Sequence, residues 1–138
     1  MNQTEQIQKQ LFEAALKARE NAHAPYSHFT VGASVYTASG KIFSAANVEN
    51  ASYGLSVCAE RIAIFKAVTE GHQKLSAMAV VADGLDPVRP CGACRQVMAE
   101  FNPQLIVIRG NLKGELIVQR LDDLYPDPFI MIPPPPAV

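Results

Sequence analysis

Three cysteines and one glutamate are the residues whose types and spacing could support chemistry. Glu60 follows Cys58 by two positions, and two residues separate Cys91 from Cys94. If both segments begin helices, the thiols lie at helix N-termini, where free N–H groups and the helix dipole lower the thiol pKa. Three sulfur ligands suit zinc and leave one tetrahedral position for water, which is typical of a catalytic zinc site.

Glu60 is the predicted proton-transfer group. A carboxylate bound to the metal would occupy the position that the water needs, so we expect Glu60 to lie beside the open position. Zinc lowers the pKa of a bound water to roughly 7, and a nearby carboxylate can take that proton and return it. Three thiolates on Zn²⁺ carry excess negative charge, and the candidates to offset it are Arg61, Arg95 and the helix N-termini.

Hydrophobic periodicity predicts the elements that position these residues. A helix is expected over 4–22 with Thr4 as its N-cap, then a β-hairpin over 30–36 and 41–46. An ordered loop over 47–57 leads to a helix over 58–70, with Ile62, Phe65 and Val68 among its inward residues. The remaining predicted elements are a strand at 77–82, a helix at 92–101, strands at 105–108 and 115–119, and a helical turn at 121–124.

This order of elements predicts an α/β fold, a three-layer α-β-α sandwich around a mixed central sheet of about five strands. The length of 138 residues and the apolar content of 49% suit one domain over residues 1–138. Pro133 to Pro136 are expected to form an extended polyproline tail, to which we assign no chemistry.

Composition restricts the classes of function. Twelve basic and thirteen acidic residues give a net charge of −1, which disfavours a nucleic acid partner. No segment reaches the ~20 apolar residues that span a bilayer, and the first ten residues are polar, so we expect a cytoplasmic protein without a membrane partner. Three cysteines cannot form a complete disulfide framework, which favours a metal or catalytic role.

Three motifs carry a resemblance to a known family. CAER at 58–61 and PCGACRQ at 90–96, preceded by NVEN at 47–50, resemble the small homotetrameric class of cytidine deaminases over roughly residues 10–129. The resemblance implies that Cys58, Cys91 and Cys94 hold one Zn²⁺ per subunit. It also implies that Glu60 moves protons between the zinc water, ring N3 and the leaving amino group, as is general for zinc nucleobase deaminases.

By this resemblance the protein converts cytidine and 2′-deoxycytidine to uridine and 2′-deoxyuridine plus ammonia, in pyrimidine salvage. Asn47 and Glu49 would bind the ribose 3′-hydroxyl of this small-molecule nucleoside. The backbone of Ala59 would contact the base, and Phe29 would pack on the nucleoside.

Neighbouring subunits of a homotetramer would complete each active site. Ala51 and Tyr53 are the residues implied to reach the sugar in a neighbouring subunit, and Phe129 is implied to close an adjacent site. The family usually has Leu-Leu-Pro before this phenylalanine, where this chain has Leu124-Tyr125-Pro126, and the proline-rich end also departs from the family pattern.

Each assignment has a simpler alternative. Cys91 and Cys94 could be a redox pair beside a buried Cys58, and Glu60 could be an ordinary acidic residue at a helix N-terminus. The remaining site residues could have purely structural roles, with Arg61 and Arg95 at the surface, Asn47 and Glu49 bracing the loop, and Phe29 and Phe129 in the core.

Three further functions compete with the leading one. A deaminase of a cytosine nucleoside analogue, of the blasticidin type, would keep the chemistry and change the substrate. Polynucleotide editing is disfavoured because the sequence lacks a basic surface interleaved with aromatic residues. A zinc-stabilised binding module would have no catalysis, and Glu60→Gln would then change nothing measurable.

Overall fold

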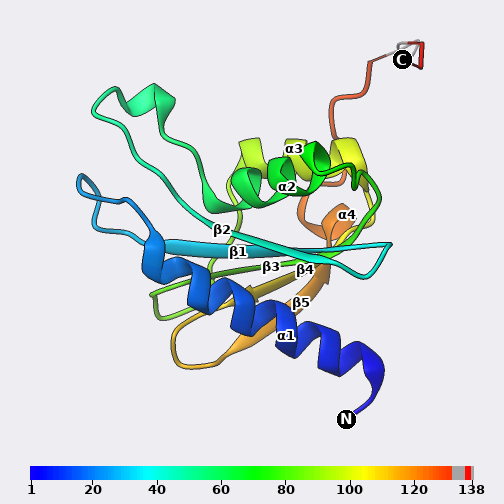
Figure 1. Ribbon diagram of the computed structural model, residues 1–138, viewed down its shortest axis with the longest axis horizontal. Helices are drawn as coiled ribbons and strands as arrows, with labels where there is room; N and C mark the ends of the chain where they lie inside the picture. Colours follow the sequence, from blue (N-terminus) through cyan, green and yellow to red (C-terminus); the bar gives the residue numbers. More distant parts are fainter. Residues whose placement is uncertain (132–135, 138) are drawn as a thin grey trace.

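The computed structural model describes residues 1–131 and 136–137, and its centre is a five-stranded mixed sheet in the order β2-β1-β3-β4-β5 (Figure 1). β1 (Val31–Thr37) pairs antiparallel with β2 (Ile42–Ala46) and with β3 (Leu75–Ala82). β3 is parallel to β4 (Ile106–Gly110), which pairs antiparallel with β5 (Leu116–Arg120). The predicted mixed sheet is confirmed.

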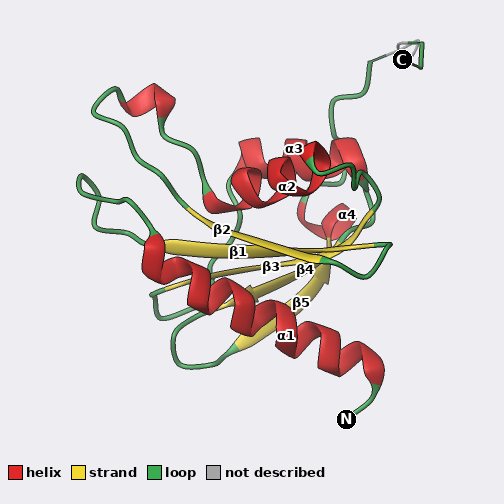
Figure 2. Ribbon diagram, viewed as in Figure 1, coloured by secondary structure: helices red, strands yellow, loops and turns green. Residues whose placement is uncertain are grey.

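Helices cover both faces of this sheet, which confirms the predicted three layers (Figure 2). α1 (Gln3–Ala18) packs on one face. α2 (Ala59–Thr69), α3 (Gly92–Phe101) and the short α4 (Leu121–Leu124) pack on the other. None of the helices in the described part of the chain has the length and apolar content that a membrane crossing requires.

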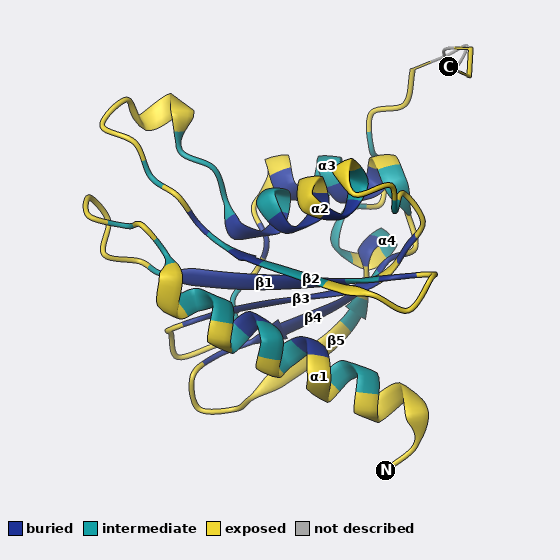
Figure 3. Ribbon diagram, in the orientation of Figure 1, coloured by how far each residue is buried: buried dark blue, intermediate teal, exposed yellow. Residues whose placement is uncertain are grey.

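The core lies on both faces of the central strand β3, as Figure 3 shows by the burial of β1, β3 and β4. Successive side chains of a strand point to opposite faces, so a strand buried on both faces has an almost continuous apolar sequence. Ala77, Ala79 and Val81 pack toward α1, whereas Met78 and Val80 pack toward α2 and α3. The predicted burial of this strand is confirmed.

Gly32 allows α1 to approach β1 closely. A Cβ atom at this position would lie 1.8 Å from the Ala15 carbonyl oxygen and 2.8 Å from the Arg19 nitrogen. Gly32→Ala is therefore expected to lower the free energy of unfolding by about 1–3 kcal/mol or more, because the backbone must move. Denaturant unfolding measures this loss, with Gly54→Ala as the control because, among the described residues, none beyond its chain neighbours lies within 4 Å of its added Cβ. Equal stabilities of the two variants would contradict the close contact.

The predicted first helix differs from the observed one at both ends. Asn2 is its N-cap, not Thr4, and the Asn2 side chain accepts a hydrogen bond from the Glu5 N–H at 2.8 Å. The α-helix ends at Ala18, and the chain tightens into a 3₁₀ turn over Arg19–Asn21 rather than continuing to residue 22. Asparagine caps helices well, and helix ends often tighten in this way.

The predicted inward face of α2 is also partly wrong. Phe65 is 46% exposed, and Ile64 is fully buried instead. The helix carries apolar or small residues around most of its circumference, so the sequence period alone does not choose the buried face.

Of the predicted polyproline tail, Pro133 to Pro135 lie outside the described residues.

Candidate metal centre and active site

The three cysteine sulfurs converge at the N-termini of two helices. Cys58 is the N-cap residue of α2, and Cys91 is the N-cap residue of α3. The Cys91 sulfur lies 3.8 Å from the Cys58 sulfur and 3.2 Å from that of Cys94. All three thiols are free and lie within 4.8 Å of one another. A set of three converging sulfurs fits Zn²⁺ and favours a metal site over an isolated redox pair.

Two of the thiols have pKa values shifted in opposite directions. The pKa of Cys58 is lowered to about 5, chiefly because the Cys94 thiol donates a hydrogen bond to it, with Arg61 as a further donor. The pKa of Cys94 is raised by the same hydrogen bond and by burial. A Cys58 thiolate is therefore favoured at neutral pH, and thiolates are the form that binds metals.

Arg61 lies beside the cysteines, and Arg95 has a different role. The Arg61 Nη2 donates to the Cys58 sulfur at 3.6 Å, and this contact is the main cause of a raised Arg61 pKa. Arg95 donates instead to two backbone carbonyls, those of Pro90 and Leu124, each at 2.9 Å. The sequence left the choice between the two arginines open, and the geometry favours Arg61 for offsetting the thiolate charge.

Glu60 is a buried carboxyl group next to the metal centre. It is 4% exposed, and its pKa is raised to about 7, mainly by burial and further by the negative charge of Cys58. Within the described part of the chain, the converging donor atoms are the three sulfurs, without the Glu60 carboxylate. A carboxyl group with a pKa near neutrality can both accept and donate a proton, which suits general acid–base catalysis.

A cavity of about 340 Å³ opens beside Glu60 and the cysteines. This volume suits a small organic ligand. Phe29 is 44% exposed at its wall, so the alternative of a core position is wrong for this residue. The predicted residues that line the cavity are Phe29, Asn47, Glu49, Cys58, Ala59, Glu60 and Cys91.

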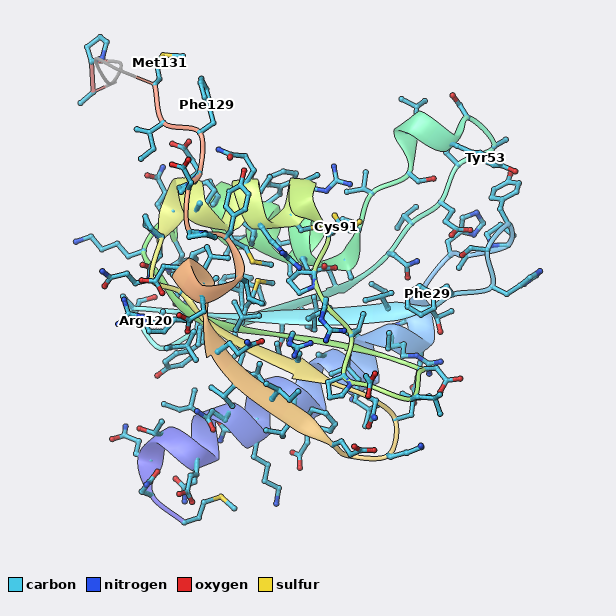
Figure 4. All side chains as sticks on the ribbon, turned by 180° about the vertical axis from the view of Figure 1, so that it is seen from behind. Phe29, Tyr53, Cys91, Arg120, Phe129 and Met131 are labelled. Atoms are coloured by element: carbon cyan, nitrogen blue, oxygen red, sulfur yellow. The ribbon has the colours of Figure 1, made fainter. Side chains whose placement is uncertain are left out.

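Three predicted substrate contacts lie outside this cavity within one chain. Ala51 is exposed, and Tyr53 is 76% exposed and packs edge-on against Tyr26, with ring centroids 6.0 Å apart. Phe129 is 74% exposed, so it is not a core residue either, and Gln96 on α3 hydrogen-bonds its backbone. Figure 4 shows Phe129 well away from both Phe29 and Tyr53. A role for these residues in a neighbouring subunit stays a prediction.

Sequence reasoning missed several residues that shape the site. Ser27 and Arg89 line the cavity, although neither belongs to a periodic pattern or a metal-ligand spacing. Arg109 on β4 is 4% exposed and donates to the Pro87 carbonyl at 3.2 Å, which holds the loop before Cys91. Burial lowers the Arg109 pKa, and the nearby Arg89 and Arg95 lower it further. The strand predicted from the sequence ends at Ile108, whereas β4 extends to Gly110 and buries this charged residue.

The fold and the site together define an α/β enzyme with a three-cysteine zinc centre and an adjacent buried acid. The family model of the cytidine and deoxycytidylate deaminase zinc-binding region matches residues 5–109. The chain belongs to this family of zinc-dependent deaminases, which confirms the resemblance and the zinc cofactor predicted from the sequence.

Individual relatives agree with this assignment. A cytidine deaminase of Halalkalibacterium halodurans is 51% identical over 120 residues, which are 86% of this chain and 91% of the relative. A crystal structure of cytidine deaminase from Burkholderia pseudomallei superimposes with a TM-score of 0.86 at 48% identity, covering 94% of this chain and all of the other. A blasticidin-S deaminase of Bacillus cereus is more distant, at 33% identity over 70% of this chain and 74% of its own length.

Proposed function

We propose that the protein hydrolytically deaminates cytidine and 2′-deoxycytidine to the corresponding uridines plus ammonia. One observation carries the proposal: three sulfurs converge beside the buried carboxyl group of Glu60, at the wall of a cavity that suits a nucleoside base. The proposed metal ligands are Cys58, Cys91 and Cys94, and the family's zinc-binding region spans all three.

Glu60 is the proposed proton carrier of the reaction. Bound zinc would supply Lewis acidity that lowers the pKa of a water at the open position to roughly 7. Glu60 takes a proton from that water and delivers it to ring N3 of cytosine while the water oxygen bonds to C4. It then takes the remaining proton from the new C4 hydroxyl and passes it to the amino group, whose bond to C4 breaks to release ammonia. The buried position of Glu60 supports this cycle, since its pKa of about 7 places both protonation states within reach at neutral pH.

The proposed substrate is a free nucleoside. Asn47 and Glu49 would bind the ribose 3′-hydroxyl, Phe29 would pack on the nucleoside, and the backbone of Ala59 would contact the base. All four residues line the same cavity as Glu60, which supports this orientation of the ligand. The blasticidin-type alternative has less support, because the cytidine deaminase of Halalkalibacterium halodurans is 51% identical to this chain, whereas the blasticidin-S deaminase of Bacillus cereus is only 33% identical.

Activity on the free nucleosides tests the function directly. Zinc-loaded protein is expected to release ammonia from cytidine and 2′-deoxycytidine and to leave single-stranded DNA and RNA unchanged. Blasticidin S serves as a competing substrate in the same assay. Turnover of blasticidin S alone, or of the polynucleotide alone, would replace the proposed substrate by another one.

We further propose one catalytic domain over residues 1–138 that assembles into a cytoplasmic homotetramer for pyrimidine salvage. Ala51, Tyr53 and Phe129 would complete the sites of neighbouring subunits. The support is the exposure of two large aromatic side chains, 76% for Tyr53 and 74% for Phe129, since side chains of this kind are enriched at protein interfaces.

Phe129→Ala tests the shared site. Because Phe129 is exposed in the single chain, the substitution is expected to leave the folding of each subunit intact while raising KM for cytidine several-fold. Steady-state kinetics and sedimentation velocity measure the two effects, with Leu85→Ala as a control at a residue that is 82% exposed. A wild-type protein that sediments as a fully active monomer would contradict the proposal.

A further inference from the structure

The Glu49 carboxylate is held by one short segment of the chain. Its Oε1 accepts hydrogen bonds from the backbone N–H groups of Tyr26 and Ser27, each at 3.1 Å. Its Oε2 accepts a hydrogen bond from the Ser27 hydroxyl. A carboxylate offers about four acceptor sites, so three donors leave roughly one site for a ligand. Because Ser27 and Glu49 both line the cavity, these contacts fix an acceptor at its wall.

The same contacts fix the segment that carries Phe29. The Ser27 hydroxyl accepts a hydrogen bond from the Phe29 N–H at 3.0 Å. On the other side, the Asn47 side chain donates to the Phe29 carbonyl at 2.9 Å and accepts from the Val31 N–H at 2.8 Å. Asn47 and Glu49 therefore do brace the loop backbone, as the simpler alternative predicted. This role does not exclude ligand binding, because both side chains also line the cavity.

The segment has a backbone conformation that needs such support. His28 has φ of 58°, in the left-handed region that residues other than glycine seldom adopt. Such a conformation costs free energy and persists where surrounding contacts determine it. Here the Ser27 hydroxyl supplies two of those contacts, one to Glu49 and one to Phe29.

We infer that Ser27 is a positioning residue for sugar recognition, which holds the Glu49 carboxylate in place to accept a hydrogen bond from a ribose hydroxyl. This inference rests on the proposed function, which supplies the identity of the ligand. The pKa of Glu49 is lowered, chiefly by the hydrogen bond from the Ser27 side chain, so the carboxylate stays ionised and accepts hydrogen bonds. Ser27 thereby favours ligands with a hydroxyl donor at the sugar over ligands without one.

Substrate truncation separates this role from a purely structural one. Ser27→Ala is expected to lower kcat/KM for 2′-deoxycytidine about tenfold, mostly through KM, because a hydrogen bond to a charged group is weakened. With 2′,3′-dideoxycytidine, which lacks the 3′-hydroxyl, the kcat/KM of the same variant is expected to fall by less than about twofold. Equal losses on both substrates would overturn the inference, because Ser27 would then support only the fold of the loop.

Two further variants sharpen this comparison. Glu49→Gln is expected to show the same dependence on the 3′-hydroxyl, and adding Ser27→Ala to it should cause little further loss. Ser76→Ala, an exposed serine on β3, is the matched control and should leave both substrates unaffected. Full additivity of Ser27→Ala and Glu49→Gln on 2′-deoxycytidine would count against action through Glu49.

Calorimetric binding makes the test independent of turnover and of the proposed reaction. The two nucleosides are titrated into zinc-loaded Glu60→Gln protein with and without Ser27→Ala, and about tenfold weaker binding of 2′-deoxycytidine alone is expected. If the wild type is active and Ser27→Ala weakens the binding of both nucleosides equally, the role of Ser27 is overturned and the proposed function stands. A wild-type protein that neither binds nor deaminates either nucleoside overturns both.

Discussion

Replacing Glu60 by glutamine is expected to lower kcat for cytidine by at least the ~10²- to 10⁴-fold typical of a general acid–base group. Glutamine has nearly the same shape but cannot carry the proton between the water, ring N3 and the leaving amino group. The three sulfurs remain in place, so we expect zinc content to be unchanged. Steady-state kinetics and metal analysis on the same preparation measure the two quantities.

The control for this prediction is Glu70→Gln, an exposed residue at the C-terminal end of the same helix. It should keep full activity. We expect Glu60→Gln to fold at least as stably as the wild type, because it removes a buried acid close to the negative charge of Cys58. Near-normal turnover of Glu60→Gln would exclude the proton-transfer role and would favour a zinc-stabilised module without catalysis.

Cys94→Ala is expected to abolish zinc binding and activity together. Cys94 is fully buried between the starts of α2 and α3, and two remaining sulfurs cannot complete the proposed three-ligand set. Because metal binding is coupled to folding, the variant should also unfold at a lower temperature than the zinc-loaded wild type. Metal analysis and thermal unfolding test this, and removal of zinc from the wild type by a chelator should produce a similar loss of stability.

Met98→Ala distinguishes the loss of a ligand from the loss of packing. Met98 is fully buried on the same helix, and its truncation is expected to cost about 2–5 kcal/mol of unfolding free energy. It should nevertheless retain zinc. Full metal occupancy in Cys94→Ala, or the same response of both variants to a chelator, would contradict the assignment of Cys94 as a ligand.

The elements with a clear sequence period were predicted well. The hairpin of β1 and β2 has alternating residues, and α3 begins and ends where the pattern places it, at Gly92 and Phe101. The prediction failed where the local sequence was ambiguous. α2 carries apolar residues on most sides, and only packing against the sheet decides that Ile64 is buried and Phe65 is exposed.

The chemistry of the site could be predicted where it depends on residues that lie a few positions apart in the sequence. The cysteines and Glu60 belong to two short motifs, and the structure brings them together at two helix N-termini. Contacts between distant segments gave no sequence signal. The bond from Ser27 to Glu49 and the bond from Arg95 to the Leu124 carbonyl both join distant segments. The contact of Arg61 with the Cys58 sulfur, by contrast, spans three residues of one helix start, a spacing that the sequence does show.

Zinc content and the loss of cytidine absorbance, measured together for wild type and Glu60→Gln, test the central claim most directly. We predict similar zinc occupancy in both proteins, near one ion per chain, and rapid conversion of cytidine by the wild type alone. Wild-type turnover without bound metal, or equal turnover by the two zinc-loaded proteins, would contradict a mechanism in which three cysteines hold zinc and Glu60 transfers the protons.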